Sequence, residues 1–249
     1  IDKWFESKIN SSIEKCTEAL EGMLFKTAIQ HSLMDMTRFF KQYLKRTNNK
    51  PNKKLANLFS ESAIKMLTPV APHFCEEAWE AIGGKGFVSL QQWPEFEEEK
   101  INPEAEAAED LFHNIMSDFN TVLELAKIEK PKGVVLVLAP KWKYELFKLL
   151  KEELKKTRDQ KALMNTCLNE KDLKPHAQDV AKIIQMALKD PGRLPNLMLQ
   201  REREAEACES AKEIIWSEYK ADVKIEFAEK SSEKKASSAM PGKPAIIVK

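Results

Sequence analysis

The sequence is poor in glycine, and it has neither a long apolar run nor a cluster of cysteines or histidines. Only 7 glycines among 249 residues, with 32% charged and 43% hydrophobic residues, are typical of a helix-rich globular protein with ordinary cores. No apolar run approaches the ~20 residues that cross a bilayer, so we expect no membrane segment and no membrane partner. The chain opens with the pattern of a charged, amphipathic helix, which argues against a signal peptide.

Cysteine and histidine are too dispersed for a zinc site. The eight residues are Cys16, Cys75, Cys167, Cys208, His31, His73, His113 and His176. None of them forms C-x-x-C, and a structural zinc ion needs clustered ligands, so we expect no metal. The thiols are expected to be reduced and half-buried on helices, which fits a cytoplasmic protein.

The net charge of +1 hides an alternation of basic and acidic zones. Residues 37–65 hold eight bases and one acid, residues 95–110 hold eight acids and one base, and residues 130–158 hold nine bases and three acids. Local basic faces of this kind suit an RNA-binding protein, and they equally suit solvated helix surfaces. Charge alone therefore leaves both interpretations open.

Apolar residues at helical spacing predict an up-and-down bundle of four helices in the first hundred residues. A first helix carries Phe5 to Leu20, a second covers 25–46, a third covers 54–67, and a fourth begins at Pro72. The expected apolar face of the second helix is Phe25, Ile29, Leu33, Met36, Phe40 and Tyr43. That of the fourth is Phe74, Ala78, Trp79 and Ile82, and a strand-like piece at 87–90 follows it.

The rest of the chain predicts a long helix and then a small α+β domain. Residues 101–128 have the spacing of a connecting helix, and the β-branched run 134–138 predicts a buried strand. Two further strands are expected at 223–227 and 244–248, with a mobile polar loop at 230–238. We therefore expect a mainly α protein with a helical bundle at 1–100, a connecting helix at 101–130 and an α+β domain at 131–249.

One segment carries a specific family resemblance. Residues 66–95 contain two prolines three apart, then E-E-x-W, and later W-P. This order resembles the anticodon-binding helical bundle of class I aminoacyl-tRNA synthetases, which reads roughly L-x-P-x-x-P-H-x-x-E-E-x-W with W-P after it. The matching residues are Leu67, Pro69, Pro72, His73, Glu76, Glu77, Trp79, Trp93 and Pro94. The alternative is a kinked core helix in some other helical domain, and the joint match favours the family.

Two more matches narrow the resemblance. Asp2, Trp4, Ser7 and Asn10 form D-x-W-x-x-S-x-x-N, which is similar to the opening of this bundle in the leucine, isoleucine and valine enzymes. The strand followed by A-P-x-W-K at 139–143, and P-G-K-P-A-I before the last strand, resemble the C-terminal domain of leucyl-tRNA synthetase of the archaeal and eukaryotic type. The resemblance covers residues 2–249.

The resemblance implies a tRNA-docking role without catalysis. In that family this region meets tRNA(Leu) by its body and its long variable arm, and the catalytic and editing domains of the parent chain are partners. The class I signatures H-I-G-H and K-M-S-K-S are absent. The resemblance thus implies no catalytic or cofactor-binding residue here, while ATP and Mg belong to the parent enzyme. The chain would be an excised fragment or a free-standing relative.

Candidate RNA-binding residues lie in three places. The candidates are Arg38, Lys41, Lys45, Arg46, Lys141, Lys143, Lys243, Ile246, Ile247 and Lys249. The first three share a helix face by their spacing, and such a face either follows a phosphate backbone or is merely solvated. For the tryptophan between Lys141 and Lys143 we favour packing over stacking on a base. The terminal segment is expected to be an edge strand that could also present its end to RNA.

Two other features are given structural interpretations. His73 is expected to be a packed or capping histidine rather than a catalytic one. Glu76 and Glu77 point about 100° apart on a helix, so they do not form an acid–base pair. Two rivals stay open at this point, namely the equivalent region of a valyl- or isoleucyl-tRNA synthetase and a non-enzymatic helical module that binds proteins.

Overall fold

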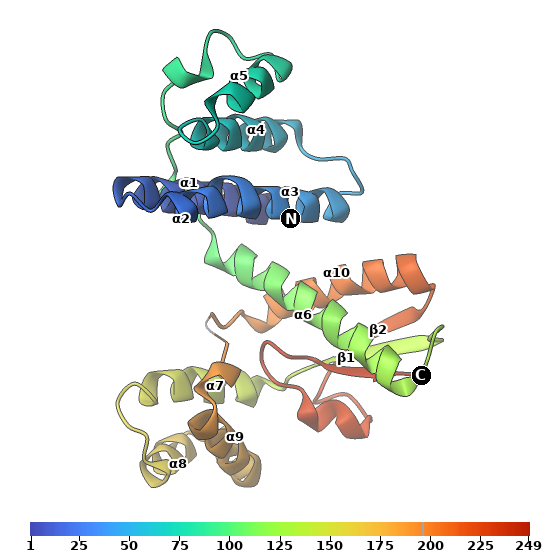
Figure 1. Ribbon diagram of the computed structural model, residues 1–249. Coiled ribbons are helices and arrows are strands. Elements are labelled where there is room, and N and C mark those ends of the chain that lie inside the picture. Colours follow the sequence, from blue (N-terminus) through green and yellow to red (C-terminus); the bar gives the residue numbers. More distant parts are fainter. Residues whose placement is uncertain (196) are drawn as a thin grey trace. The chain divides into compact units, whose positions relative to one another are not determined.

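The computed structural model describes residues 1–195 and 197–249, which form two compact units, Ile1–Glu106 and Ala107–Lys249. The first unit is helical, and the second adds a three-stranded sheet (Figure 1). The predicted fold class, a mainly α helical bundle with a small α+β part, is confirmed. None of the helices in the described ranges is long and apolar enough to cross a membrane.

The first unit is built on five α-helices and one π-helical segment. Its elements are α1 (Asp2–Glu21), α2 (Phe25–Ile29), the π-helix η1 (Gln30–Asp35), α3 (Met36–Arg46), α4 (Lys53–Leu67) and α5 (Pro72–Ala81). Phe5 lies at the centre of its core, with its ring stacked on Tyr43 at a centroid distance of 4.3 Å. Phe40 stacks on Phe59 at the same distance. Aromatic packing therefore joins α1, α3 and α4.

The predicted second helix is interrupted, and part of its predicted apolar face is wrong. The π-helical turn η1 lies between α2 and α3 and carries more residues per turn than an α-helix. The face consequently shifts, so that Met36 and Tyr43 are buried whereas Phe25 and Leu33 are exposed. A period of 3.6 residues could not anticipate this change.

The face predicted for the fourth helix is also wrong. Cys75 and Trp79 are buried on α5, but Phe74 is 61% exposed and Ile82 is exposed. The expected strand at 87–90 is a 3₁₀ turn, η2 (Val88–Leu90), which packs Val88 against the Cys75–Trp79 face. A second 3₁₀ turn, η3 (Glu98–Lys100), precedes α6.

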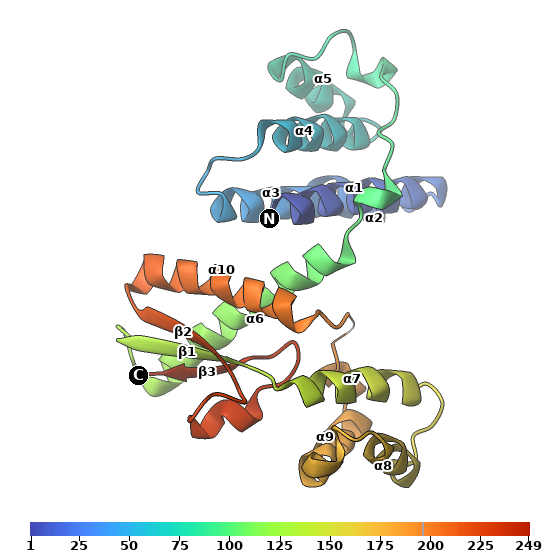
Figure 2. The same ribbon diagram turned by 180° about the vertical axis from the view of Figure 1, so that it is seen from behind.

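The second unit places helices on one face of its sheet. Its helices are α6 (Pro103–Ala126), α7 (Lys141–Glu153), α8 (Gln160–Asn169), α9 (Ala177–Lys189) and α10 (Arg201–Tyr219), and its strands are β1 (Gly133–Leu138), β2 (Asp222–Phe227) and β3 (Ala245–Val248). The strand order is β2-β1-β3, with β2 parallel and β3 antiparallel to β1 (Figure 2). Helices α6 and α10 cover the face of β1 that carries Val134, Leu136 and Leu138.

Helices α7, α8 and α9 form a separate apolar cluster beside the sheet. The opposite face of β1 packs against the 3₁₀ turn η6 (Lys234–Ser238), where Ala236 is buried. The polar segment expected to be a mobile loop thus contains an ordered turn. All four cysteines are buried and free, more deeply than the half-burial we expected. Burial raises the pKa of the Cys208 thiol to about 12, which makes it unreactive.

Candidate nucleic-acid interface

The basic side chains of α3 lie on the helix face opposite the core. We call Arg38, Lys41, Lys45 and the adjacent Arg46 the α3 basic face. Lys41 and Lys45 are exposed, and no ion pair of either is found among the described residues. The Arg38 guanidinium is 68% exposed, donates to an Asp35 carboxylate oxygen at 3.0 Å, and lies 5.0 Å from the centre of the Phe39 ring. The face therefore presents a net positive charge on one side of a helix, mainly from Lys41 and Lys45.

The C-terminal end of α3 is fixed by a polar clasp. The Tyr43 hydroxyl donates to an Asp2 carboxylate oxygen at 2.5 Å and accepts from the Asn52 backbone N–H at 3.2 Å. The Asn52 amide donates to the second Asp2 oxygen at 3.2 Å, and its oxygen caps α4 at Lys54. These bonds tie together the ends of α1, α3 and α4, so the basic face has a fixed frame.

The residues of the opening motif are structural. Ser7 donates to Glu106 at 2.6 Å and accepts from the Asn102 N–H at 2.8 Å. The Asn10 side-chain oxygen accepts from the Glu97 N–H at 2.8 Å. Both side chains therefore hold the segment before α6 along the first helix, and polar side chains that bond backbone in this way fix the path of a loop.

The same segment is held further along by Trp93. Its indole N–H donates to the Thr17 hydroxyl at 2.8 Å. Trp93 also packs against the core of the first unit. We call residues 93–102, which run along α1, the strap. The W-P motif thus belongs to the strap and not to an exposed binding surface.

The E-E-x-W motif closes the turn after α5. Glu76 accepts hydrogen bonds from the Val88 N–H at 2.8 Å and from the Ser89 N–H at 3.1 Å. Desolvation opposes the shift, but these bonds and that of the Ser89 hydroxyl lower the pKa of Glu76. Glu77 is exposed. His73 is exposed and caps no helix, so the expected packed or capping role is wrong.

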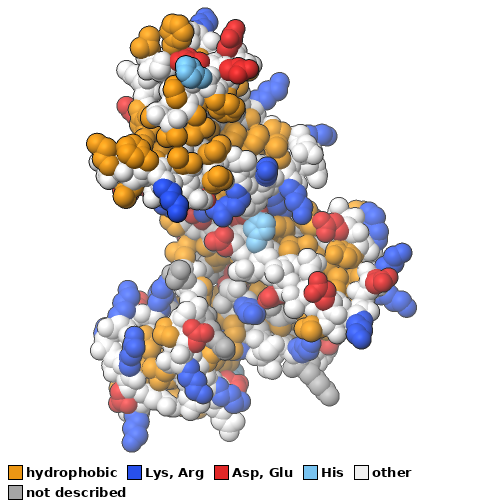
Figure 3. All heavy atoms as spheres, in the orientation of Figure 1, with side chains coloured by type: hydrophobic (Ala, Val, Ile, Leu, Met, Phe, Trp, Pro, Cys, Tyr) orange, Lys and Arg blue, Asp and Glu red, His pale blue; other side chains and the backbone are white. Residues whose placement is uncertain are grey.

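Hydrophobic side chains are exposed on the first unit as well. On the face drawn in Figure 3 they gather over the unit that contains α1 to α5. The exposed large apolar residues of this unit include Met23, Leu24, Phe25, Met34, Val70, Phe74, Phe87 and Leu90. The α3 basic face and this apolar surface are distinct features of one small helical unit.

Lys143, a candidate RNA contact from the sequence, is buried and does not lie exposed on the protein surface. The residue is 3% exposed, and its ammonium donates to the carbonyl oxygens of Ser237 at 2.6 Å and Ala239 at 2.8 Å. Burial lowers the pKa of Lys143, and the nearby Asp179 opposes this shift. Lys141 is exposed, and its backbone N–H donates to Glu229, which caps α7.

The terminal segment is docked on the sheet. Ile246 is 8% exposed and lies in the core under α6 and α10, so its side chain is not an RNA contact. Ile247 is partly buried against the other core. Lys249 pairs with Glu233 at 2.5 Å, and Lys243 lies 3.7 Å from Asp118. Of the four tail candidates, the two lysines keep exposed side chains.

A buried carboxylate that the sequence analysis missed lies beneath the tail. Glu204 is 1% exposed, accepts from the Tyr144 hydroxyl at 2.7 Å, and accepts from the Gly242 N–H at 2.7 Å. Burial raises the pKa of Glu204 to about 7, against the effects of these two donors and of Arg201. A glutamate in the first turn of a helix gave no signal, because its partners come from distant segments.

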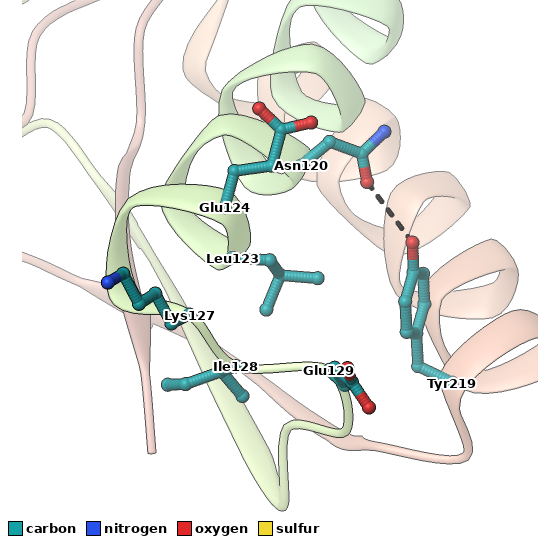
Figure 4. Close-up of a pocket in the computed structure, with 7 residues that line it drawn as sticks. All are labelled: Asn120, Leu123, Glu124, Lys127, Ile128, Glu129 and Tyr219. Atoms are coloured by element: carbon teal, nitrogen blue, oxygen red, sulfur yellow. Dashed lines mark hydrogen bonds between the residues drawn. The ribbon is translucent and has the colours of Figure 1, made fainter.

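One cavity of the second unit, shown in Figure 4, has a volume of about 510 Å³. Its lining includes Glu124, Glu129 and Lys127, and this mixed charge does not favour a phosphate. Tyr219 and Asn120 form one wall through a 3.3 Å hydrogen bond. Within the described residues there is no group of three or more His, Cys, Asp or Glu that could hold a metal ion.

Comparison with known proteins identifies the family. Residues 2–137 match the family described as the anticodon-binding domain of tRNA ligase, which is more than half of the chain. The chain belongs to this family. The matched range contains α1 to α6, the α3 basic face and all but the last residue of β1.

Archaeal leucine–tRNA ligases are similar to this chain over nearly the whole of its length, in addition to the match with the anticodon-binding family. The chain is 31% identical to the enzyme of Pyrococcus abyssi over 255 residues, 33% identical to that of Aeropyrum pernix over 248 residues and 32% identical to that of Methanocaldococcus jannaschii over 251 residues. These matches cover 99–100% of the chain and 25% of each relative. The chain therefore spans about a quarter of the length of these relatives, and the resemblance to the leucine enzymes is confirmed.

Proposed function

We propose that this chain binds transfer RNA as the docking region of a leucine–tRNA ligase. The observation that carries the proposal is the α3 basic face, a set of four cations on one helix within the range that matches the anticodon-binding family, of which Arg38, Lys41 and Lys45 are exposed. Phosphate contacts of this kind supply sequence-independent affinity and fix the register of a bound nucleic acid. The parent enzyme would join leucine to its tRNA in the cytoplasm, with catalytic and editing domains outside this chain.

The parent reaction uses ATP and Mg²⁺, and neither group fits the residues present here. The sequence has no H-I-G-H or K-M-S-K-S signature, and the described part of the chain offers no cluster of three potential metal ligands. We therefore assign this chain no chemical step. Its contribution is to hold the RNA.

The finer part of the proposal concerns the long variable arm of tRNA(Leu). Lys243 and Lys249 keep exposed ammonium groups at the two ends of the segment that contains β3. Because β3 is an edge strand locked onto β1, these two lysines are held in fixed positions. A paired A-form arm is recognised by its shape and phosphates, and unpaired tip bases add sequence.

The test of tRNA binding is a salt titration. Replacing Arg38, Lys41 and Lys45 together with alanine should weaken binding to total tRNA and flatten the slope of log affinity against log salt by roughly 2 to 3, from about 0.7–0.9 per lost contact. The matched control replaces Lys148, Lys155 and Lys161, three exposed lysines of the second unit. An unchanged slope in the first variant, with unchanged helicity, would show that the α3 basic face is only solvated.

The same assay separates the rival functions. A helical module that binds only proteins predicts no measurable affinity for tRNA at low salt. A valine or isoleucine enzyme predicts equal affinity for long-arm and short-arm tRNA, whereas the leucine assignment predicts a preference for the long arm. The similarity of nearly the whole chain to leucine enzymes favours the leucine assignment.

A further inference from the structure

A second cavity of the second unit has the features of a base-binding pocket. It has a volume of about 420 Å³ and lies where the parallel strands β1 and β2 end, between Pro140 and Ala228. Ligands of sheet proteins commonly bind outside the carboxyl ends of parallel strands, and a volume of this size is typical of small-molecule sites. The cavity uses none of the cations of the α3 basic face.

One wall of the cavity is a stack of two rings. The Trp142 indole and the His176 imidazole are nearly parallel, with an interplanar angle of 10° and a centroid distance of 4.3 Å. Both side chains are only partly buried, and both line the cavity. A flat ring that enters the cavity can therefore extend an existing stack.

Lys143 supplies a buried donor to the same cavity. Its ammonium has three protons, and the hydrogen bonds found in the described residues use two of them, toward Ser237 and Ala239. The residue is 3% exposed and is part of the cavity lining. The ammonium also lies 5.5 Å from the centre of the Trp142 ring, beside the stack. Its third proton has no hydrogen-bond acceptor among the described residues, and a ring nitrogen or carbonyl oxygen of a ligand that accepts it would remove a cost of burial.

The remaining polar lining favours a base over a phosphate. Three carboxylates line the cavity, and each is shared with one cation: Asp179 with Lys182, Glu229 with Arg201, and Glu233 with Lys249. Carboxylates repel a phosphate group. A carboxylate has more acceptor positions than one cation uses, so these side chains can still accept from an amino group.

We propose that this cavity binds a nucleobase with an exocyclic amino group, stacked against Trp142 and His176, with Lys143 donating to its ring acceptor. Adenine, cytosine and guanine fit this description, and uracil lacks the amino group. The base could belong to an unpaired nucleotide of bound tRNA or to a free nucleotide. The RNA source rests on the proposed function, whereas the free-nucleotide source does not.

The experiment follows the Trp142 indole N–H signal by NMR on the full 249-residue chain. The Trp142→Phe variant assigns this signal among those of the 5 tryptophans. Titration with AMP, CMP, GMP and UMP should shift it with the three amino-bearing nucleotides more than with UMP. Total tRNA should shift the same signal, and the Trp216 signal should stay in place because Trp216 lies on α10 outside the cavity.

Affinity measurements on variants complete the test. Trp142→Ala should weaken nucleotide and tRNA binding roughly 5- to 150-fold, as expected for the loss of one stacking contact, whereas Trp142→Phe should retain most of it. Lys143→Met removes the donor and should also weaken binding, whereas Trp216→Ala, the matched control, should leave binding unchanged. If Trp142→Ala lowers the melting temperature, Lys143→Met decides, and unchanged affinity in that variant overturns the pocket.

The outcomes separate this inference from the proposed function. Unchanged affinity in Trp142→Ala at unchanged melting, or equal shifts of the Trp142 and Trp216 signals, overturns the pocket. If tRNA binding depends on the α3 basic face alone, the proposed function stands and the pocket fails. If nucleotides bind at Trp142 but tRNA does not bind the chain, the pocket stands as a nucleotide site and the proposed function fails.

Discussion

At the scale of single residues, the side chains that carry the family resemblance act mainly on the protein itself. Ser7, Asn10 and Trp93 fix the strap along α1, and Glu76 closes the turn after α5. The motif could be recognised in the sequence, but these roles could not, because the bonding partners lie 12 to 99 positions away. The proposed binding surface consists of residues outside the motifs.

The Trp79 ring of the E-E-x-W motif lies so close to residue 84 that only glycine fits there. A Cβ atom on Gly84 would lie 2.3 Å from the Trp79 ring, which is far inside contact distance. We expect Gly84→Ala to destabilise the first unit by about 1–3 kcal/mol through this overlap, measured by urea denaturation. Gly83→Ala is the neighbouring control, because its Cβ meets nothing within 4 Å and only its φ of +85° is strained.

A Trp79→Leu background distinguishes the two glycines. If the clash with the ring is the cause, the cost of Gly84→Ala should fall in this background, while the cost of Gly83→Ala should stay the same. Equal costs of Gly84→Ala in both backgrounds would contradict the steric explanation. The conformational cost of a left-handed residue does not depend on the neighbouring ring.

Glu204 makes the stability of the second unit depend on pH. Because burial raises its pKa from 4.5 to about 7, the folded state binds the proton more tightly than the unfolded state. Stability should therefore fall as pH rises from about 4.5 to 7, by at most about 3 kcal/mol, and change little through this group above 7. The groups that face it are Tyr144, the Gly242 N–H, Arg201 and Cys208.

The measurement compares wild type with Glu204→Gln by chemical denaturation at several pH values. Glutamine keeps the shape and one acceptor oxygen, which can serve the Gly242 N–H, while its amide group can donate to the Tyr144 hydroxyl; it does not titrate. The difference in stability between the two proteins should favour wild type at pH 5 and the variant at pH 8. A difference that is constant across this range would mean that Glu204 does not titrate there.

At the scale of elements, boundaries were predictable and buried faces were less so. The strands at 134–138 and 223–227 and the long helix of 103–126 follow from apolar runs and spacing. The buried face of α5 could not be chosen, because Phe74 and Trp79 are both apolar and the turn at 88–89 selects between them. The burial of Lys143 depends on carbonyl groups nearly a hundred residues away.

The edge strand β3 limits how its proposed RNA contact can be tested. Removing residues 246–249 would expose the core beneath Ile246 and lower the melting temperature, so truncation cannot isolate recognition. We expect Lys249→Ala with Lys243→Ala to lower affinity for a long-arm tRNA more than for a short-arm tRNA, because both lysines are exposed and their ion pairs are at the surface.

Lys148→Ala with Lys161→Ala is the matched control, because both lysines are exposed and lie on α7 and α8, outside the sheet. The ratio of the two affinities, measured at one salt concentration, is the decisive quantity. If the double variant keeps the wild-type ratio and the wild-type melting temperature, β3 is structural and the arm is recognised elsewhere.

At the scale of the whole molecule, two units with separate cores divide the charge unevenly along the chain. The overall charge of +1 would not suggest a nucleic-acid partner. The basic zone at 37–65 places four cations on α3, one in the turn that follows and three on α4. Much of the basic zone at 130–158 is spread around α7 and includes the buried Lys143. A basic zone of the sequence therefore becomes a continuous basic face only where the helix places its cations on one side.

The chain as a whole should bind tRNA without activating an amino acid. Adenylate formation needs groups that hold the ATP phosphates, and the class I signatures that do so are missing from the sequence. We expect the purified chain to show no leucine-dependent ATP–pyrophosphate exchange and no aminoacylation. The positive control is the full-length relative from Pyrococcus abyssi, of which this chain matches 25%. Docking needs only electrostatic and shape contacts with the RNA, and none of these contacts activates leucine. Measurable leucine-dependent exchange by the chain alone would therefore contradict its assignment as a docking region without catalysis.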